Sequence, residues 1–382
     1  VTTTSSTISI TTIITTIIQV TQHIQSLYIH IINYIMTTLK EYKIRMSNKF
    51  KGVALSGQPN NTKPTTDIIN ERDENLKLEK VMLPHVIERS EKFPHIYLEP
   101  LNSSIGTVIH GIDMANVSQE EVDYIRSIWL KRKVVFFRNQ GHITPAQQLE
   151  FASKFGDLGG THGEWHNEPM LIMTGKKGFE ELPTVEGHRG LMKLYANEKF
   201  PNAAANWHSD VTWAPKPPIG TLLLARKAAP VGGDTVFCDA YAMYQGLDDE
   251  TKAELQNLRA YHKGSPYGHG DISAIHPVLR THPETGATAL FVNPTFTQGI
   301  IGMEQDKAVN LLKHLERQMY HPEYQCRFKW QDGSVAMWDN RACQHYASGD
   351  FWPHKRLMER CIILGRTDEE KIPFYKPIMN KL

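Results

Sequence analysis

Hydrophobic and polar residues alternate in helix-like and strand-like segments from about residue 96 onward. Ser118-Gln119-Glu120-Glu121 has the residue types of a capping box and predicts a helix that runs to about Lys131. The apolar run at 134–137 predicts a buried strand. Thr144-Pro145 predicts the start of a second helix, which covers residues 146–155 and ends at Gly156.

From Gly156 to Trp207 the chain is rich in glycine and polar residues, so we expect a long loop, which in a compact domain is commonly a lid or a binding segment. The later pattern predicts strands at 221–225, 234–237, 325–330, 334–338 and 357–364, a hairpin at 277–292, and helices at 241–247, 249–258 and 303–320. Short strands at this spacing favour an antiparallel barrel or jelly roll over a parallel sheet.

The first part of the chain has a different pattern. Residues 1–39 contain no Asp, Glu, Lys or Arg and consist largely of Thr and Ile. A membrane anchor is one interpretation, but polar residues interrupt the stretch and it lacks the basic residues of a signal or transit peptide. We expect residues 1–45 to be a disordered or non-native leader, with Met46 as a plausible start. Residues 46–95 should be a flexible lead-in, and residues 96–378 the folded domain.

Composition narrows the function classes. The 382 residues are 40% hydrophobic and 22% charged, with a formal net charge of +1, so we expect neither nucleic acid nor a membrane as a partner. Four cysteines without CxxC or zinc-finger spacing favour free thiols in a reducing compartment, and we expect a cytoplasmic protein. The sequence contains no GxGxxG, Walker, GxSxG or HExxH motif.

Candidate chemistry begins at Trp207-His208-Ser209-Asp210. In an extended strand, residues two apart point to the same face, so His208 and Asp210 can converge on one point. One imidazole and one carboxylate are two thirds of the facial triad that holds non-heme Fe(II), and His345 offers the missing imidazole. Taken alone, His-x-Asp also fits an ordinary hydrogen-bonded or surface pair, so the motif needs support from the rest of the chain.

Two arginines follow His345. If their segment is a strand, Arg356, Met358 and Arg360 share one face, and both guanidiniums can enter the same cavity. Arginine is the side chain suited to a bidentate grip on a carboxylate or sulfonate. Paired surface arginines are the alternative interpretation.

These segments resemble the TauD/TfdA family of Fe(II)/2-oxoglutarate-dependent dioxygenases over about residues 96–378, with the greatest likeness to the taurine, alkylsulfonate and alkylsulfate branch. The matching blocks, in order, are Trp207-His208-Ser209-Asp210-Val211-Thr212-Trp213, Val231-Gly232-Gly233-Asp234-Thr235, His276-Pro277-Val278-Leu279-Arg280-Thr281-His282-Pro283, Phe291-Val292-Asn293, Trp338-Asp339-Asn340-Arg341, His345-Tyr346-Ala347 and Arg356-Leu357-Met358-Glu359-Arg360.

The resemblance implies a mainly β fold with flanking helices and a double-stranded β-helix (jelly-roll, cupin-like) core. It implies that His208, Asp210 and His345 bind Fe(II). It also implies that Arg356 forms a salt bridge with the distal carboxylate of the co-substrate 2-oxoglutarate, to which the Thr235 hydroxyl adds a hydrogen bond. O₂ is then the second co-substrate, and the family often forms homo-oligomers.

The implied substrate is a small anionic organic molecule. By resemblance, Arg360 holds its acidic group or helps fix the co-substrate, while Val211 and Phe296 are candidate pocket residues. His162 is a candidate for a sulfonate-binding histidine, if the alignment slips by one residue. The position four before the first iron ligand, often polar where taurine's amine binds, is Ala204. This departure argues against taurine itself.

The expected reaction is hydroxylation of a sulfonate at the carbon next to sulfur, which releases sulfite and an aldehyde together with succinate and CO₂. The same chemistry on an alkyl sulfate ester or a phenoxy acid is the alternative. Outside this class, a zinc hydrolase or a catalytically silent cupin-like binding protein would also use His-Asp-His, although a zinc hydrolase has no need of Thr235 and Arg356.

Overall fold

The computed structural model describes residues 88–159, 184–196, 205–264 and 269–377, and every structural statement below concerns these residues. Their largest sheet has the strand order β1-β2-β3-β4-β16-β8-β18-β7-β6, with β5 paired to β18. The bounds are β1 Glu88–Arg89, β2 Tyr97–Pro100, β3 Thr107–His110, β4 Val134–Phe137, β5 Asp157–Leu158, β6 Thr184–Val185, β7 His188–Ala196, β8 Gly220–Lys227, β16 Val335–Asp339 and β18 Arg356–Leu364. Its pairs are antiparallel except β3 with β4.

Three smaller antiparallel sheets accompany the large one: β15-β9-β17, β11-β10-β14 and β12-β13. Their strands are β9 Thr235–Asp239, β10 Arg259–Gly264, β11 His269–Pro277, β12 Leu279–Thr281, β13 Thr288–Leu290, β14 Thr297–Ile300, β15 Gln325–Phe328 and β17 Cys343–Ala347. Both β9 and β17 matter for the site, because they face the large sheet.

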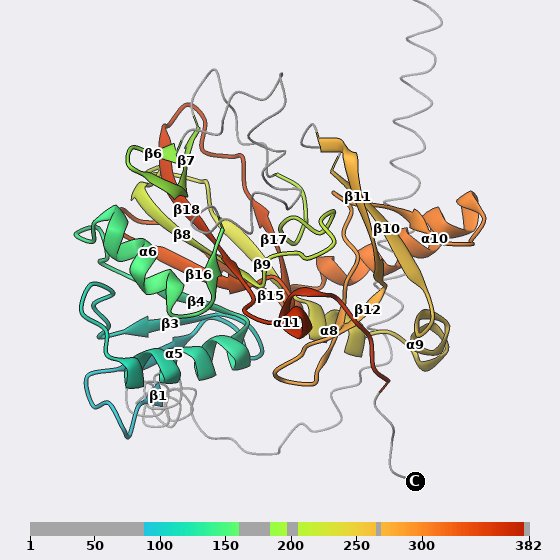
Figure 1. Ribbon diagram of the computed structural model, residues 1–382, viewed down its shortest axis with the longest axis horizontal. Helices are drawn as coiled ribbons and strands as arrows, with labels where there is room; N and C mark the ends of the chain where they lie inside the picture. Colours follow the sequence, from blue (N-terminus) through green and yellow to red (C-terminus); the bar gives the residue numbers. More distant parts are fainter. Residues whose placement is uncertain (1–87, 160–183, 197–204, 265–268, 378–382) are drawn as a thin grey trace, which may run out of the picture. The chain divides into compact units, whose positions relative to one another are not determined.

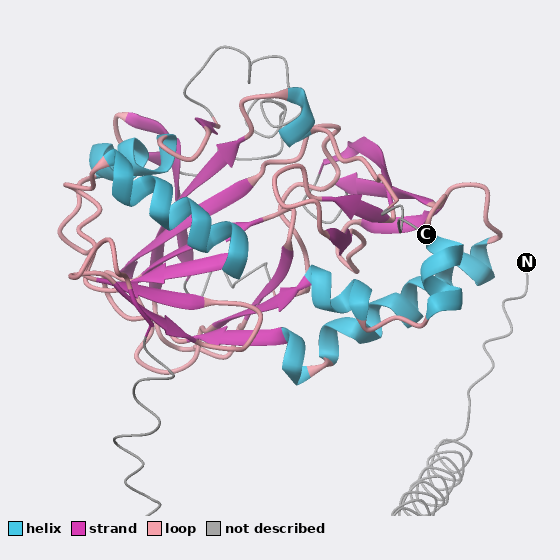
Figure 2. Cartoon of the chain, turned by 90° about the horizontal axis from the view of Figure 1, so that it is seen from below, coloured by secondary structure: helices cyan, strands magenta, loops and turns pink. Residues whose placement is uncertain are grey.

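The helices are α5 Gln119–Arg132, α6 Pro145–Ser153, α8 Ala240–Gln245, α9 Asp249–Leu255, α10 Gln305–Glu316 and α11 Asp368–Lys371, with the 3-10 helices η3 Arg317–Tyr320 and η4 Pro322–Tyr324. Ser118 and Thr144 cap α5 and α6 with complete capping boxes, as predicted. Figure 2 shows the helices in separate groups around a strand-rich centre.

Side-chain alternation along the central strands produces the layers. In β4, Val135 and Phe137 pack in one hydrophobic cluster with α5 and α6, while Val134 and Phe136 pack in a second cluster with residues of β9, β15 and β17. Phe136 stacks on Phe328 of β15, with ring centroids 4.0 Å apart. The large sheet therefore carries helices on one face and the β15-β9-β17 sheet on the other (Figure 1). The predicted mainly β, jelly-roll fold with flanking helices is confirmed.

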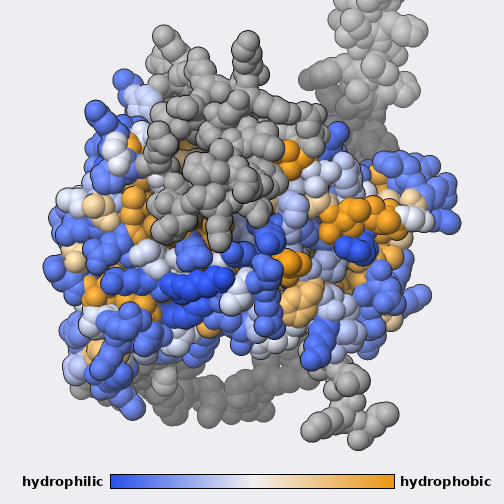
Figure 3. Space-filling model, in the orientation of Figure 1, coloured by the Kyte–Doolittle hydropathy of each residue, from blue (hydrophilic) through white to orange (hydrophobic). Residues whose placement is uncertain are grey.

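A third cluster lies beyond the β15-β9-β17 sheet. It joins Cys238 of β9 to residues of α8, α9 and α10 and to the strands β10, β12, β13 and β14. Figure 3 shows that hydrophobic residues on the visible face gather in small patches within a mostly hydrophilic surface. The apolar side chains of these clusters thus pack in the interior and hold the two facing sheets together.

The expectation of one long loop between Gly156 and Trp207 is wrong in part. The strands β5, β6 and β7 fall inside this interval. The longest, β7, pairs with β18, and Lys193 lies opposite Glu359. Backbone pairing with a strand from far along the chain thus makes a strand of a segment that looks too polar to be one.

The predicted division into leader, lead-in and folded domain stays a prediction, since residues 1–87 lie outside the described residues. The strand β1, within the expected lead-in, pairs with β2. None of the helices in the described ranges has the length and apolar character needed to cross a membrane.

Candidate metal centre and anion-binding residues

His208 and His345 come from distant parts of the chain and meet in an isolated antiparallel bridge. The backbone N–H of His208 donates to the carbonyl of His345 at 3.0 Å, and the N–H of His345 donates to the carbonyl of His208 at 2.8 Å. The imidazole centroids are 4.2 Å apart. The bridge therefore places both imidazoles on one side of the backbone pair.

Asp210 reaches the same point through a turn, so the expectation of an extended strand at 208–210 is wrong. Only His208 has strand-like pairing, and Val211 adopts the left-handed region with φ 55°. This conformation is rare for a β-branched residue, and it reverses the chain directly after Asp210. The carboxylate of Asp210, just before this reversal, lies close to both imidazoles.

The three side chains converge. Asp210 Oδ1 lies 3.8 Å from His208 Nε2 and 3.9 Å from His345 Nε2. One ligand atom from each of the three residues can be chosen so that all lie within 4.8 Å of one another, and all three residues are buried. The predicted trio is thus brought together with a spacing that a single metal ion can bridge.

The protonation states suit a cation. Burial lowers the pKa of His208 and holds the pKa of His345 well below its ordinary value, so both imidazoles are neutral near pH 7. Burial alone would raise the pKa of Asp210, but the charge of the Arg360 guanidinium, together with the hydrogen bond from the Thr221 hydroxyl, outweighs it and the pKa is lowered. An ionised carboxylate with two neutral imidazoles is the donor set that binds divalent metals.

The orientation of His208 is fixed by a backbone group. Its Nδ1 lies 2.8 Å from the carbonyl oxygen of Asn206, which can only accept, so Nδ1 carries the hydrogen and Nε2 keeps its lone pair for a ligand. In His345, Nδ1 is buried and has no hydrogen-bond partner among the described residues. These residues fit a non-heme Fe(II) triad.

The side chains of Thr235 and Arg356 both lie near that of Trp330. Trp330 Nε1 donates to the Thr235 hydroxyl at 3.0 Å, and the Arg356 guanidinium carbon lies 5.6 Å from the Trp330 ring. Burial lowers the pKa of Arg356 to about 10, which leaves it charged at neutral pH. Arg356 Nε is buried, and no residue in the described ranges forms a hydrogen bond with it. A buried cation beside a hydroxyl can bind a carboxylate.

Arg360 lies next to the trio, as predicted from its position in β18. Its Nη2 is 2.6 Å from Asp210 Oδ1, and its side chain keeps 18% of its exposure. Within the described part of the chain, its Nε is buried without a hydrogen-bond partner. Arg356 and Arg360 thus belong to the same strand, Arg360 lies against the trio and Arg356 near Trp330, and each keeps a donor for an anion.

Of the candidate pocket residues, Val211 and Phe296 are buried together in a small cluster with Trp213 and Ala214. The Phe296 ring meets the His208 ring edge-on, with centroids 6.0 Å apart. Both therefore lie against the trio. His162 and Ala204 lie outside the described residues, so their candidate roles stay predictions.

Sequence reasoning missed several contacts. Trp330, which joins Thr235 to Arg356, carries no sequence signal beyond its place near a strand. The contact of the Asn206 carbonyl with His208 has no sequence signal either, because every residue has a backbone carbonyl. Thr221 and Asn340, which hydrogen-bond around Asp210, could have been suspected only in part, since Asn340 lies in a matching block.

Comparison with known proteins agrees with this geometry. The model of the "Taurine catabolism dioxygenase TauD, TfdA family" matches residues 98–362. The chain is similar to an alpha-ketoglutarate-dependent sulfate ester dioxygenase of Pseudomonas putida, at 28% identity over 74% of this chain and 92% of the relative. It is also similar to an alpha-ketoglutarate-dependent sulfonate dioxygenase of Saccharomyces cerevisiae, at 26% identity over 68% of this chain and 65% of the relative.

Among solved structures, the chain is similar to a taurine dioxygenase from Burkholderia xenovorans, with a TM-score of 0.61 and 30% identity over 74% of this chain and 97% of that one. The family match spans most of the chain and includes all three residues of the candidate metal centre. The resemblance seen in the sequence is confirmed: the chain belongs to the TauD/TfdA family of dioxygenases.

Proposed function

We propose that this protein is an Fe(II)- and 2-oxoglutarate-dependent dioxygenase that hydroxylates a small sulfonate at the carbon next to sulfur. The observation that carries the proposal is the buried convergence of His208, Asp210 and His345 beside Arg360 of β18. The names of the similar proteins support the reaction class and the sulfur-containing substrate.

In this proposal, His208, Asp210 and His345 hold the metal and leave the remaining coordination positions open. Bound Fe(II), with 2-oxoglutarate and O₂, supplies oxidative decarboxylation to succinate and CO₂ and hydroxylation of a C–H bond. The side chains of the protein bind, orient and exclude water.

Arg356 and Thr235 bind the distal carboxylate of 2-oxoglutarate. The Trp330 N–H donates to the Thr235 oxygen at 3.0 Å, so the hydroxyl hydrogen is free to be donated to a carboxylate. Arg356 is 6% exposed, and a charge-assisted hydrogen bond gains strength in such a poorly hydrated place. The pair therefore selects a co-substrate with a second carboxylate.

Arg360 binds the acidic group of the substrate or helps fix the co-substrate. It is the more exposed of the two arginines and lies directly at the metal-facing oxygen of Asp210. Val211 and Phe296 supply apolar surface beside His208, which suits the carbon chain of an organic anion. His162 is a further candidate for the sulfonate group.

Hydroxylation next to a sulfonate gives an unstable adduct. The new hydroxyl oxygen loses its proton and becomes a carbonyl, while the carbon–sulfur bond breaks and sulfite leaves with the bonding electrons. The products are an aldehyde, sulfite, succinate and CO₂. A sulfate ester would give an aldehyde and sulfate by the same route, and a phenoxy acid is the other alternative.

A zinc hydrolase and a silent binding protein are the competing classes. Neither class needs a buried arginine and hydroxyl for a second carboxylate, the role proposed here for Arg356 and Thr235.

The test is a panel of alkyl- and arylsulfonates, alkyl sulfates and phenoxyacetates, scored by succinate formed with Fe(II), 2-oxoglutarate and air. We expect sulfonates to release succinate and sulfite in equal amounts. Succinate release coupled only to sulfate esters or phenoxy acids would overturn the sulfonate proposal.

We also propose a cytoplasmic homo-oligomer. The four cysteines are free and buried, which agrees with a reducing compartment. Light scattering on the purified full chain measures the oligomeric state, and a monomer at micromolar concentration would contradict this proposal.

A further inference from the structure

The two carboxylate oxygens of Asp210 have different surroundings. Oδ1 lies 3.8 Å from His208 Nε2, 3.9 Å from His345 Nε2 and 2.6 Å from Arg360 Nη2. Oδ2 instead accepts from the hydroxyl of Thr221 at 2.7 Å and from Trp338 Nε1 at 3.2 Å. Two neutral donors thus hold Oδ2, while Oδ1 lies between the two imidazoles and the Arg360 guanidinium, on the side of the candidate metal position.

Asn340 determines which way the Thr221 hydroxyl points. The Asn340 side-chain oxygen accepts from Trp338 Nε1 at 3.1 Å and from the Asp210 backbone N–H at 3.3 Å. The amide nitrogen of Asn340 must therefore face Thr221, to which it donates at 3.3 Å. Because a hydroxyl has a single hydrogen, the Thr221 hydroxyl donates that hydrogen to Asp210.

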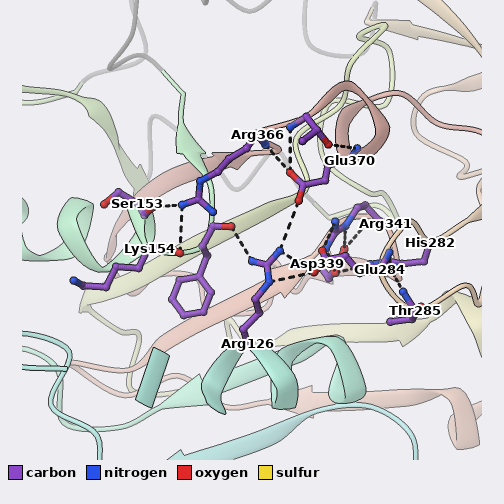
Figure 4. Close-up of polar contacts among 12 residues, drawn as sticks. Arg126, Ser153, Lys154, His282, Glu284, Thr285, Asp339, Arg341, Arg366 and Glu370 are labelled. Carbon is purple, nitrogen blue, oxygen red and sulfur yellow. Dashed lines mark hydrogen bonds and ion pairs between the residues drawn. The ribbon is translucent and has the colours of Figure 1, made fainter. Parts of the chain in front are cut away.

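These three residues are themselves held firmly. Thr221 in β8 and Trp338 in β16 are paired across neighbouring strands, and both are buried. Asn340 stands between Asp339 and Arg341, whose side chains form an ion pair with Nη2 2.7 Å from Oδ2. Figure 4 shows how this pair continues. His282 lies 3.0 Å from the Asp339 carboxylate, and Glu284 lies 2.9 Å from the Arg341 guanidinium. Glu284 also pairs with Arg126 of α5, at 2.8 Å.

We propose that Thr221, Trp338 and Asn340 are positioning residues that prevent rotation of the Asp210 carboxylate and leave Oδ1 as the ligand oxygen. The inference rests on the proposed metal centre. Without the two donors, the carboxylate could rotate about its bond to the side chain, so that Oδ1 would leave its place beside the imidazoles and Arg360 and the three ligand atoms would no longer be preorganised. Donors of this kind commonly change metal affinity 10- to 100-fold when removed.

The test is Mn(II) binding to the full chain, measured by the electron paramagnetic resonance signal of free Mn(II). Thr221→Val keeps the shape of the side chain and removes the hydroxyl, and we expect the dissociation constant to rise about 10- to 100-fold. Thr221→Ser restores the hydroxyl and should bind Mn(II) close to wild type. This rescue separates hydrogen bonding from a loss of packing.

Thr107 offers a matched control. It is 1% exposed, and its hydroxyl has no hydrogen-bond partner within the described part of the chain. Thr107→Val makes the same chemical change in β3, and we expect unaltered Mn(II) affinity. Trp338→Phe removes the other donor to Oδ2 and serves as the deciding variant if Thr221→Val does not fold by circular dichroism.

Three outcomes are decisive. Wild-type affinity in both Thr221→Val and Trp338→Phe would overturn the positioning role while leaving the metal centre intact. A serine variant as weak as the valine variant would also overturn it. If the wild-type protein itself fails to bind Mn(II), the proposed metal centre is wrong and the inference falls with it.

Discussion

His208 and His345 exchange two backbone hydrogen bonds, at 3.0 and 2.8 Å, although they are far apart in the sequence. A mutual pair of this kind fixes the separation and direction of both imidazoles before any ligand arrives. The spatial relation of the two histidines is thus a property of the backbone, and Asp210 completes the site from a turn.

The first prediction concerns the co-substrate. Arg356→Ala should weaken 2-oxoglutarate binding roughly 30-fold or more, because it removes a desolvated charge from a buried pair. Fe(II) binding should persist. Titration of 2-oxoglutarate into the anaerobic Fe(II) protein measures the effect, and Arg259→Ala, which removes an exposed arginine, is the control. Unchanged affinity in Arg356→Ala would show that the co-substrate binds elsewhere.

The second prediction separates the two roles left open for Arg360. If it binds the substrate anion, Arg360→Gln should raise KM for the sulfonate roughly 10- to 100-fold, as expected for a lost charged hydrogen bond, and leave 2-oxoglutarate affinity intact. If it fixes the co-substrate, the affinity for 2-oxoglutarate should fall instead. Steady-state kinetics with varied substrate and co-substrate distinguish the two. A variant with neither change would remove Arg360 from the site.

A third prediction concerns stability. Asp339 is fully buried, and Arg341 and His282 lower its pKa against the effect of burial. Asp339→Asn breaks the fully buried pair with Arg341, whose remaining ion pair in the described part of the chain is with Glu284, and should lower the free energy of unfolding by about 3–5 kcal/mol. Urea denaturation measures it. As a control, Glu120→Gln breaks the exposed pair with Lys92 and should lower the free energy of unfolding by no more than about 1 kcal/mol. Equal losses in the two variants would show that the contacts of Asp339 with Arg341 and His282 do not stabilise the fold as described.

The fourth prediction concerns pH. Burial lowers the pKa of His276 to about 4, so between pH 6.5 and 4 the unfolded chain takes up a proton that the folded protein does not bind. The free energy of unfolding should therefore decrease as the pH is lowered through this window, and this residue should account for a decrease of about 2 kcal/mol at pH 5. His276→Gln keeps a donor for the Thr212 and Ala214 carbonyls. Its loss of stability between pH 7 and pH 5 should be correspondingly smaller, and an equal loss would disprove the assignment.

Much of the fold follows from local sequence signals. The capping boxes at Ser118 and Thr144 place two helices, and the apolar runs place the central strands. The strand β7 could not be predicted in this way, because it forms by pairing with β18. Such pairings join distant segments and leave no local pattern.

The site divides in the same way. The three candidate ligands and both arginines can be chosen from residue type, spacing and family resemblance. The turn at Val211 cannot, since its φ of 55° opposes the preference of valine and is imposed by the surroundings. Nor can the Thr221–Asn340 contact, which depends on how β8 pairs with β16.

The most direct test of the central claim is an anaerobic titration of the purified protein with Fe(II) and 2-oxoglutarate, followed by visible absorption. The wild-type protein should develop a charge-transfer band, and His208→Ala should not, because one of its three metal ligands is missing. Exposure of the wild-type complex to air with a sulfonate should then yield succinate. No band from the wild-type protein, together with no succinate in air, would contradict the assignment of this chain as an Fe(II)/2-oxoglutarate dioxygenase.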